Sequence, residues 1–498
     1  MVNPDRLSAL DTTFLDLESE RGPMHVGALA RFEGGPLRDR RGALDRARIV
    51  RHVEARIANA PRFHQRLAWV PFGAGRPVWT DDPHFNIHYH VRFTGLPRPG
   101  GAAELEGLTA ELMARRLDRE RPLWEMHWVD GLDDGRVGLV LKVHHCMVDG
   151  VAGMNVAAVI FDLDPAAVVE AAPAFRPRPE PSGFARWRDA LAERAVEPAR
   201  FARAASARLA SPRALVKTLV DEAAGLRAWL GEGFAPRTCL NVPIGPHRRF
   251  ATATFPLASA KGVKNVLGGT VNDVVLATVA GALRRFLLHR GATCLGLELH
   301  VAVPVNVRPG ADGRGLGNRV AAMMVRLPVE IADPARRYER IRLATRVRKH
   351  SHEIELAEVI TELPGFPPAT LLHHLGDLQP AQRFLNTVVT NVPGPPFPLY
   401  ACGARLLDLH PCIPLGPNLP LMVGVVSYEG KLGVGLMGDW DAMADLEVLA
   451  RHFEEAFGEL VAAASPRSKR STEAAPRNAA ARHRRAGREA RRPSVHIR

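Results

Sequence analysis

The sequence has few cysteines, few aromatic residues and no long apolar run. The five cysteines are scattered and contain no C-x-x-C pair: Cys146, Cys239, Cys294, Cys402 and Cys412. A disulfide framework and a structural zinc site are therefore not expected. This cysteine pattern instead fits a protein of the reducing cytoplasm. The longest apolar candidate, residues 274–283, is about half of the roughly 18 residues that span a membrane. The first residues also lack the apolar stretch of a secretory signal, so any membrane contact is expected to be peripheral.

The net charge is +13, but it is unevenly distributed. The last 33 residues, 466–498, hold eleven Lys/Arg against two Asp/Glu, which leaves only +4 for the other 465 residues. A mildly basic body with a basic tail does not favour nucleic-acid binding. At 498 residues and 46% hydrophobic composition, the chain is long enough for two domains.

Residues 1–170 alternate helical and extended patterns. Asp45 is a plausible N-cap for a helix with apolar residues on one stripe, which Pro61 ends. Leucines at 105, 108 and 112 mark a second helix. Residues 124–129 and 137–143 are predicted to form two strands, because a glycine- and aspartate-rich turn separates them. This region is expected to be the N-terminal domain.

Composition changes near residue 171. Four prolines between 173 and 181 predict a linker, and an Ala/Arg-rich helical crossover follows in 171–239. A second domain is predicted over 240–465, ending in an amphipathic helix with apolar residues from Leu446 to Leu460. The tail 466–498 lacks apolar periodicity and is expected to be disordered.

The densest chemical signal is the heptapeptide 144–150, H-H-C-M-V-D-G, at the end of an apolar strand. Consecutive side chains of a strand alternate faces, so His144 and His145 are expected to point in different directions. An imidazole can accept the proton of a hydroxyl at neutral pH. A thioester is already an activated acyl donor, so an alcohol can attack it with base assistance alone. The absence of a G-x-S-x-G elbow agrees with a reaction that uses no serine nucleophile.

Three other interpretations of this heptapeptide stay open. The pair could be a satisfied core histidine beside an exposed one. His144, His145 and Asp149 could bind a metal, although no further His/Asp/Glu cluster lies nearby to complete the coordination. Cys146 could be a nucleophile, but nothing in the sequence pairs it with an activating group.

H-H-x-x-x-D-G is the signature of the coenzyme A-dependent acyltransferase superfamily, and the sequence around it resembles the bacterial wax ester synthase/diacylglycerol acyltransferases. Six blocks occur in that family's order between about residues 5 and 462. They are the opening 7–11 with Phe14 and 23–27, Pro122-Leu123-Trp124, the heptapeptide, 240–249, the N-D block 270–277 and the turn block 390–395.

The resemblance implies a role for each matching position. His145 would deprotonate the acceptor alcohol and His144 would support the site. Asp149 would be structural, held by an arginine that the sequence does not identify, and Gly150 would allow a tight turn. Asn272 and Asp273 would approach the site from the second domain, although helix capping explains them equally well. Pro122, Leu123 and Trp124 would line the substrate channel or only pack the hairpin.

The resemblance also implies the fold and the reaction. The fold would be α/β (α+β), with two chloramphenicol-acetyltransferase-like sandwich domains and an active-site tunnel at their interface. The chain would be an acyl-CoA-dependent O-acyltransferase that makes triacylglycerol from diacylglycerol, and wax esters from long-chain alcohols. Acyl-CoA would be a co-substrate, with no bound cofactor or metal, and the residues that contact coenzyme A are not identified. The protein would work in the cytoplasm at a membrane or lipid-body surface.

Two alternatives remain. One is an acyltransferase or condensation enzyme of the same superfamily that acts on another alcohol or amine. The other, from a different class, is a non-catalytic protein that binds lipid droplets.

Overall fold

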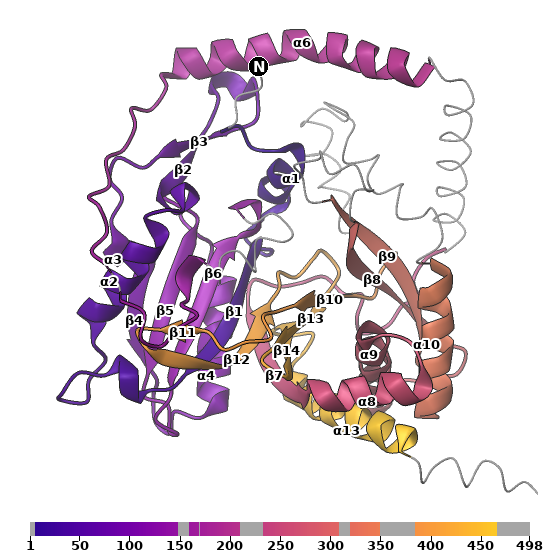
Figure 1. Cartoon of the computed structure of the whole chain (residues 1–498). Coiled ribbons are helices and arrows are strands. Elements are labelled where there is room, and N and C mark those ends of the chain that lie inside the picture. Colours follow the sequence, from indigo (N-terminus) through magenta and orange to yellow (C-terminus); the bar gives the residue numbers. More distant parts are fainter. Residues whose placement is uncertain are drawn as a thin grey trace, which may run out of the picture.

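The computed structural model has two lobes, each built on a six-stranded mixed sheet (Figure 1). It describes residues 5–147, 159–168, 170–209, 233–307, 319–348 and 384–465. The tail 466–498 lies outside the described residues, so its disorder stays a prediction. The α/β two-lobe fold expected from the sequence is confirmed.

The N-terminal lobe contains sheet 1, in the order β11-β12-β1-β6-β5-β4. Its strands are β1 (His25–Phe32), β4 (Val91–Gly95), β5 (Trp124–Asp130), β6 (Val137–His144), β11 (Tyr400–Ala401) and β12 (Ala404–Cys412). A separate hairpin pairs β2 (Gln65–Ala68) with β3 (Val78–Asp81). The predicted pairing of β5 with β6 is confirmed as an antiparallel ladder.

The helices of this lobe are α1 (Ala9–Leu17), α2 (Arg46–Ile57), α3 (Ile87–His90) and α4 (Ala102–Ala114). Short 3-10 turns are η1 (Gly35–Leu37), η2 (Pro61–His64), η3 (Pro71–Gly73) and η4 (His145–Met147). Asp45 caps α2, since its carboxylate accepts a hydrogen bond from the backbone N–H of Arg48 at 3.0 Å. The predicted first helix is thus confirmed together with its cap.

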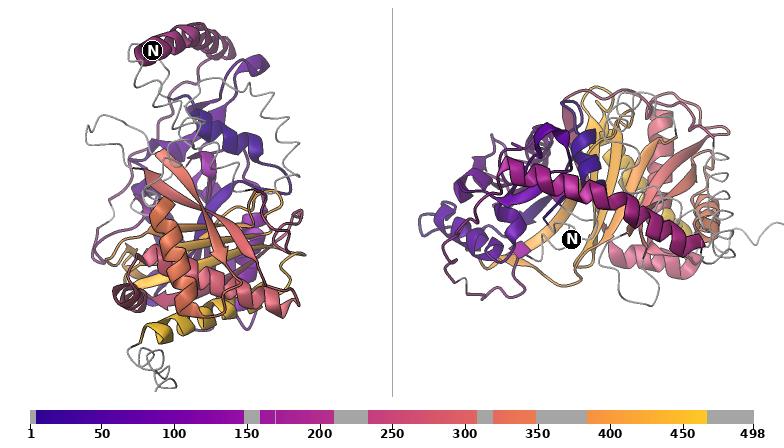
Figure 2. Two further views of the ribbon diagram at one scale, coloured as in Figure 1. Left: turned by 90° about the vertical axis from the view of Figure 1, so that its right-hand side faces the viewer. Right: turned by 90° about the horizontal axis from the view of Figure 1, so that it is seen from above.

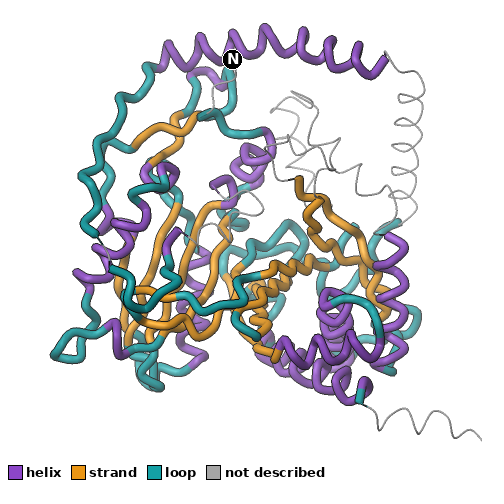
Figure 3. Tube along the Cα trace, in the orientation of Figure 1, coloured by secondary structure: helices purple, strands orange, loops and turns teal. Residues whose placement is uncertain are grey.

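The C-terminal lobe contains sheet 2, in the order β7-β14-β13-β10-β8-β9. Its strands are β7 (Arg248–Pro256), β8 (Glu298–Val307), β9 (Arg319–Pro328), β10 (Thr387–Pro393), β13 (Leu421–Tyr428) and β14 (Lys431–Asp439). Its helices are α8 (Leu257–Leu267), α9 (Val271–His289), α10 (Pro334–Arg348) and the predicted closing helix α13 (Leu446–Ala464). Figure 3 shows these helices gathered on one side of the lobe.

Helix α9 is buried over most of its length, because it packs against α13, α10, α8 and strands of sheet 2 in the main apolar core of this lobe. Its apolar residues therefore form a protein core. No single described helix is long and apolar enough to cross a bilayer. The pair α8–α9, which is bent by 100°, reaches the length and apolar composition of a membrane span only when its two helices are taken together.

Two strands cross the domain boundary that the sequence predicts. Strands β11 and β12 lie in the region assigned to 240–465, yet they extend sheet 1, with β12 antiparallel to β1. The division into 1–170 and 240–465 is therefore too simple. Strand β12 fits its place because its side chains alternate between buried and partly exposed, but no local pattern specifies which sheet it joins.

The lobes also meet through side chains. The carboxylate of Glu106 on α4 accepts hydrogen bonds from the backbone N–H of Thr252 at 2.8 Å and from its hydroxyl at 2.6 Å. Thr252 lies on β7, so this contact joins the two lobes directly. An apolar cluster also joins the lobes, since it includes Leu29 and Leu105 from one and Phe250 from the other.

The proline-rich segment after residue 171 lies against the N-terminal lobe. Phe175 stacks on His64 with ring centroids 4.6 Å apart, and the Arg178 guanidinium forms an ion pair with Asp81 at 3.0 Å. The segment has no helix or strand, as predicted, but it is anchored rather than free. It leads to α6 (Gly183–Leu209), which passes above both lobes in Figures 1 and 2.

Candidate active site

Two backbone hydrogen bonds fix the turn that follows β6. The N–H of His144 donates to the carbonyl of Leu123 at 2.9 Å, and the N–H of His145 donates to the carbonyl of Met24 at 2.8 Å. The first bond comes from the residue before β5 and the second from the residue before β1. The two histidines are therefore held between both neighbouring strands of the sheet.

The ring of His145 packs against helix α1. It stacks on Phe14 with centroids 3.8 Å apart and an interplanar angle of 23°. Burial lowers the pKa of His145 to about 4, and its contact with its own backbone opposes that shift only in part. At neutral pH the ring is an uncharged, desolvated base.

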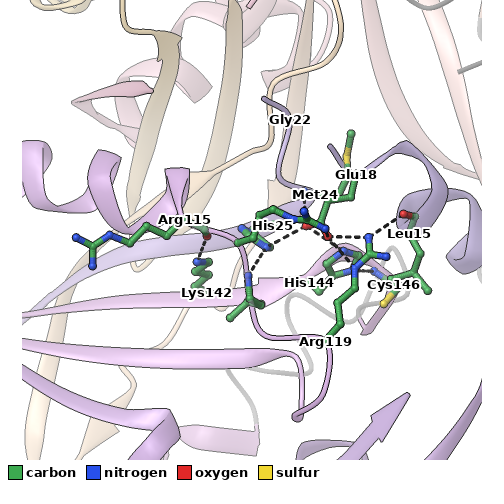
Figure 4. Close-up of polar contacts among 12 residues, drawn as sticks. Leu15, Glu18, Gly22, Met24, His25, Arg115, Arg119, Lys142, His144 and Cys146 are labelled. Atoms are coloured by element: carbon green, nitrogen blue, oxygen red, sulfur yellow. Dashed lines mark hydrogen bonds and ion pairs between the residues drawn. The ribbon is translucent and has the colours of Figure 1, made fainter. Parts of the chain in front are cut away.

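The ring of His144 faces a buried carboxylate. Its Nδ1 accepts a hydrogen bond from the backbone N–H of Cys146 at 3.1 Å, and its Nε2 lies 3.5 Å from an oxygen of Glu18 (Figure 4). The expectation that the two adjacent histidines have different surroundings is confirmed: His144 meets Glu18 and His145 meets Phe14.

Glu18 is charged although its side chain is almost completely buried. Burial alone would raise its pKa, but hydrogen bonding with His144 and His25 and the charges of these rings hold the pKa far below its usual range. The guanidinium of Arg119 completes the site, with Nη2 2.7 Å and Nε 3.0 Å from the second carboxylate oxygen. A bidentate arginine of this kind keeps a carboxylate ionised.

His25 stands opposite His144 in the ladder between β1 and β6. Its Nε2 lies 3.3 Å from Glu18, and burial lowers its pKa to about 4. On the same face, the ammonium of Lys142 donates to the carbonyl of Arg115, and burial lowers the lysine pKa to about 8 (Figure 4). A row of polar groups thus crosses the buried face of sheet 1 next to the two histidines.

Cys146 is not activated. The residue is buried, and burial raises the pKa of its thiol well above the usual range. A thiol that stays protonated is a poor nucleophile. The geometry therefore argues against the nucleophile interpretation of Cys146.

Two residues of the heptapeptide, Asp149 and Gly150, lie outside the described residues. Among the residues that the structure does describe, no group of three His, Cys, Asp or Glu side chains could hold a metal ion. Glu18, His25 and His144 therefore do not form a metal site either.

Pro122, Leu123 and Trp124 lie directly beneath the histidine turn. Leu123 is fully buried and its carbonyl accepts the His144 N–H. Trp124 is also fully buried and donates its indole N–H to the carbonyl of Phe63 at 2.8 Å. These contacts are those of hairpin packing that supports the site.

Asn272 and Asp273 make their described contacts within the C-terminal lobe. Asp273 completes a capping box at the start of α9, where it accepts from the Thr270 N–H at 2.7 Å and from the Thr345 hydroxyl at 2.6 Å. The amide of Asn391, in the turn block, donates to the Asn272 side chain at 3.3 Å. The structure therefore brings the N-D block and the turn block together, and it gives Asp273 a capping role.

Comparison with known proteins identifies the family. The model of the wax ester synthase/diacylglycerol acyltransferase catalytic domain matches residues 7–275, and the model of the family's C-terminal domain matches residues 316–461. The chain belongs to this family.

Curated relatives of this family match almost end to end. A probable diacylglycerol O-acyltransferase of Mycobacterium tuberculosis is 34% identical over 472 residues, which cover 92% of this chain and 96% of the relative. A second one from the same organism is 35% identical over 479 residues, covering 92% and 98%.

Solved structures agree on the fold. The wax ester synthase/diacylglycerol acyltransferase from Marinobacter aquaeolei VT8 superposes with a TM-score of 0.65 at 27% identity, covering 92% of this chain and 99% of that one. The first condensation domain of the calcium-dependent antibiotic synthetase superposes with a TM-score of 0.55 at 20% identity, covering 92% and 96%, and shows the fold alone.

The buried charged residues of this site were not predicted from the sequence. Glu18 and Arg119 stand outside all six blocks, and Glu18 is separated from His144 by more than a hundred residues. His25 lies inside the opening block, but nothing local indicates that it faces Glu18. The antiparallel register of β1 and β6 places His25 beside His144, and the end of α1 and the loop after α4 bring Glu18 and Arg119 to them.

The buried histidines predict a pH-dependent stability. Burial lowers the pKa of His25, His90 and His145 to about 4, whereas an imidazole in the unfolded chain titrates near pH 6.5. Below about pH 6.5 the unfolded state binds protons that the folded state does not, so the free energy of unfolding falls as the pH drops toward 4. We expect the urea midpoint to fall between about pH 6.5 and pH 5 and to change little between about pH 7 and pH 8. A His90→Gln variant should show a shallower slope, and an unchanged midpoint at about pH 5 would contradict the prediction.

Proposed function

We propose that this chain transfers a fatty acyl group from acyl-coenzyme A to the hydroxyl of an acceptor lipid. Diacylglycerol is the first acceptor, giving triacylglycerol, and a long-chain alcohol is the second, giving a wax ester. The single observation that supports this most is the uncharged imidazole of His145 on a fixed turn, in a chain whose residues 7–275 match the family's catalytic domain.

The reaction needs one base and no covalent enzyme intermediate. The unprotonated ring nitrogen of the neutral His145 imidazole takes the proton of the acceptor hydroxyl while the hydroxyl oxygen attacks the thioester carbonyl. The tetrahedral intermediate then expels the coenzyme A thiolate, which receives the same proton from the imidazolium. The products are the ester and coenzyme A as a free thiol, so His145 returns to its neutral state without a net proton.

The ring of His145 is partly shielded from water, and this suits the chemistry. Phe14 covers one face of the ring, so bulk water does not occupy that side. A desolvated base is not stabilised as the cation before the substrate arrives, and the neutral form is present at all pH values well above 4. His144 supports the turn, and the roles that the family resemblance implies for Asp149 and Gly150 stay predictions, because both residues lie outside the described part of the chain.

The substrates are proposed to meet at His145 in a tunnel between the lobes, acyl-CoA from one side and the acceptor from the other. Acyl-CoA is then a co-substrate rather than a resident cofactor. Trp124 supports the histidine turn from the N-terminal lobe by packing beneath it, and Asn272 would approach the channel from the C-terminal lobe. The acceptors are lipids, so the protein would act at the surface of a membrane or lipid body.

The test is the release of free thiol from palmitoyl-CoA by the full chain, with 1,2-diacylglycerol, hexadecanol or no acceptor. We expect release that depends on the acceptor, together with formation of the corresponding ester. Palmitoyl attached to a carrier protein serves as the comparison donor and is expected to be much poorer. Binding to lipid droplets without acceptor-dependent thiol release would favour the non-catalytic alternative, and a preference for the carrier-bound donor would favour a condensation-type reaction.

A further inference from the structure

Glu18 occupies an unusual position for a carboxylate. It is the C-cap residue of α1, and its side chain is only 1% exposed between the histidine turn and Arg119 (Figure 4). A buried carboxylate costs free energy unless each oxygen has a partner. The partners of its two oxygens are therefore informative.

The two oxygens face different groups. Oε2 meets the guanidinium groups of Arg119, at 2.7 and 3.0 Å, and Arg116, at 3.4 Å. Oε1 accepts from the backbone N–H of Met24 at 3.3 Å, and it lies 3.3 Å from Nε2 of His25. One side of the carboxylate is thus paired with positive charge, and the other side is directed at the residues that hold the turn.

Two chains of contacts lead from Oε1 to His145. In the first, the Nδ1 of His144 is already occupied by the N–H of Cys146, so the proton of a neutral His144 ring must be on Nε2, the atom that faces Oε1 at 3.5 Å. In the second, the Met24 peptide donates its N–H to Oε1 and accepts the N–H of His145 with its carbonyl. Glu18 therefore contacts both residues that fix the base.

We propose that Glu18 is a positioning residue for the acyl transfer proposed above. Its ionised carboxylate holds His144 as the Nε2–H tautomer and holds the Met24 peptide, and through these two groups it fixes the turn that presents His145. It does not touch the substrates or exchange protons with them. The inference rests on the proposed function for its kinetic consequence, but its effect on His144 is independent of turnover.

The Glu18→Gln variant tests this arrangement because it keeps the shape of the side chain and changes only its acceptors. If the amide oxygen faces Arg119, the NH₂ group faces the Nε2–H of His144 and the N–H of Met24, which are both donors. If the amide is turned around, its NH₂ group faces the guanidinium. In one orientation the side chain therefore loses its contacts with His144 and Met24, and in the other it loses its contact with Arg119.

Asp408→Asn is the matched control. Asp408 on β12 is also a buried carboxylate that faces an arginine and a histidine, with Arg31 at 2.7 Å and His410 at 3.5 Å. It lies in the same sheet, but its partners are not those of the histidine turn. Both variants should lose thermal stability to a similar extent, so a difference in turnover reports position rather than folding.

The experiment measures kcat and KM of the full chain for palmitoyl-CoA with 1,2-diacylglycerol in the parent, E18Q and D408N. We expect kcat of E18Q to fall by about 10- to 100-fold, the range for a catalytic group displaced by an ångström or less, with KM almost unchanged. D408N should keep kcat within about threefold of the parent, since Arg31 and His410, the partners of Asp408, do not hold the histidine turn. An E18Q variant with the kcat of the parent, or with the same loss as D408N, overturns the inference.

A second measurement separates this inference from the proposed function. Nitrogen-15 NMR of the histidine rings, with the His144 signal identified by its loss in His144→Phe, should give Nε2–H in the parent and a changed tautomer pattern in E18Q. If the parent releases no thiol with either acceptor but E18Q alters the His144 pattern, the proposed reaction is wrong and the hold of Glu18 on His144 stands. An identical His144 pattern in parent and E18Q overturns the inference whatever the parent catalyses.

Discussion

Replacing His145 by alanine is expected to lower acceptor-dependent release of coenzyme A from palmitoyl-CoA by about 10²- to 10⁴-fold, the usual contribution of a general base. The expectation follows from the position of His145, whose backbone N–H donates to the Met24 carbonyl and whose ring stacks on Phe14. Its pKa of about 4 keeps it neutral under all ordinary assay conditions. The loss should therefore appear in kcat and be the same at about pH 6.5 and pH 8.

His90→Ala is the matched control for this prediction. His90 is a buried histidine whose pKa burial also lowers to about 4, but its ring contacts Trp124 and Phe85 instead of Phe14 and the histidine turn. Its removal should lower stability and leave most of the turnover. If His145→Ala keeps the parent rate, or if both variants lose activity equally, His145 is not the base.

Replacing Trp124 by alanine is expected to lower the free energy of unfolding by about 3–5 kcal/mol, the range for a large aromatic removed from a core. Trp124 is fully buried, stacks on His90 with centroids 4.5 Å apart, and meets Phe63 edge-on at 5.3 Å. Its indole N–H donates to the Phe63 carbonyl, so truncation also leaves a buried carbonyl without its partner. Urea unfolding followed by circular dichroism measures the loss.

Two further tryptophan variants serve as comparisons for the stability of Trp124→Ala. Trp124→Phe restores most of the volume but not the hydrogen bond, so it should recover more than half of the lost stability. Trp440→Ala removes a tryptophan that is 47% exposed, beneath the Arg249 guanidinium, and should cost about 1 kcal/mol or less. Equal losses for Trp124→Ala and Trp440→Ala would contradict the packing role. Full stability of Trp124→Phe with a raised KM for the acceptor would instead favour a channel wall.

Local patterns predicted individual elements well. The helix capped by Asp45, the hairpin of β5 and β6 and the closing helix α13 all follow from spacing that a segment carries within itself. The order of the six blocks was also sufficient to indicate the family. The same local reasoning left two equal interpretations for the N-D block, and only the hydrogen bonds of Asp273 to Thr270 and Thr345 favour capping.

The sequence by itself determined the elements, the family and the histidine pair at the end of β6, because these depend on residues that are close in the chain. The tertiary structure alone decided that β12 completes sheet 1 and that Glu18, His25 and Arg119 surround His144. The physical reason is that a carboxylate becomes a fixed, ionised partner only when folding removes it from water and brings a guanidinium to it. That juxtaposition depends on the register of β1 against β6 and on the placing of α1 over the turn, which no periodicity in the chain records.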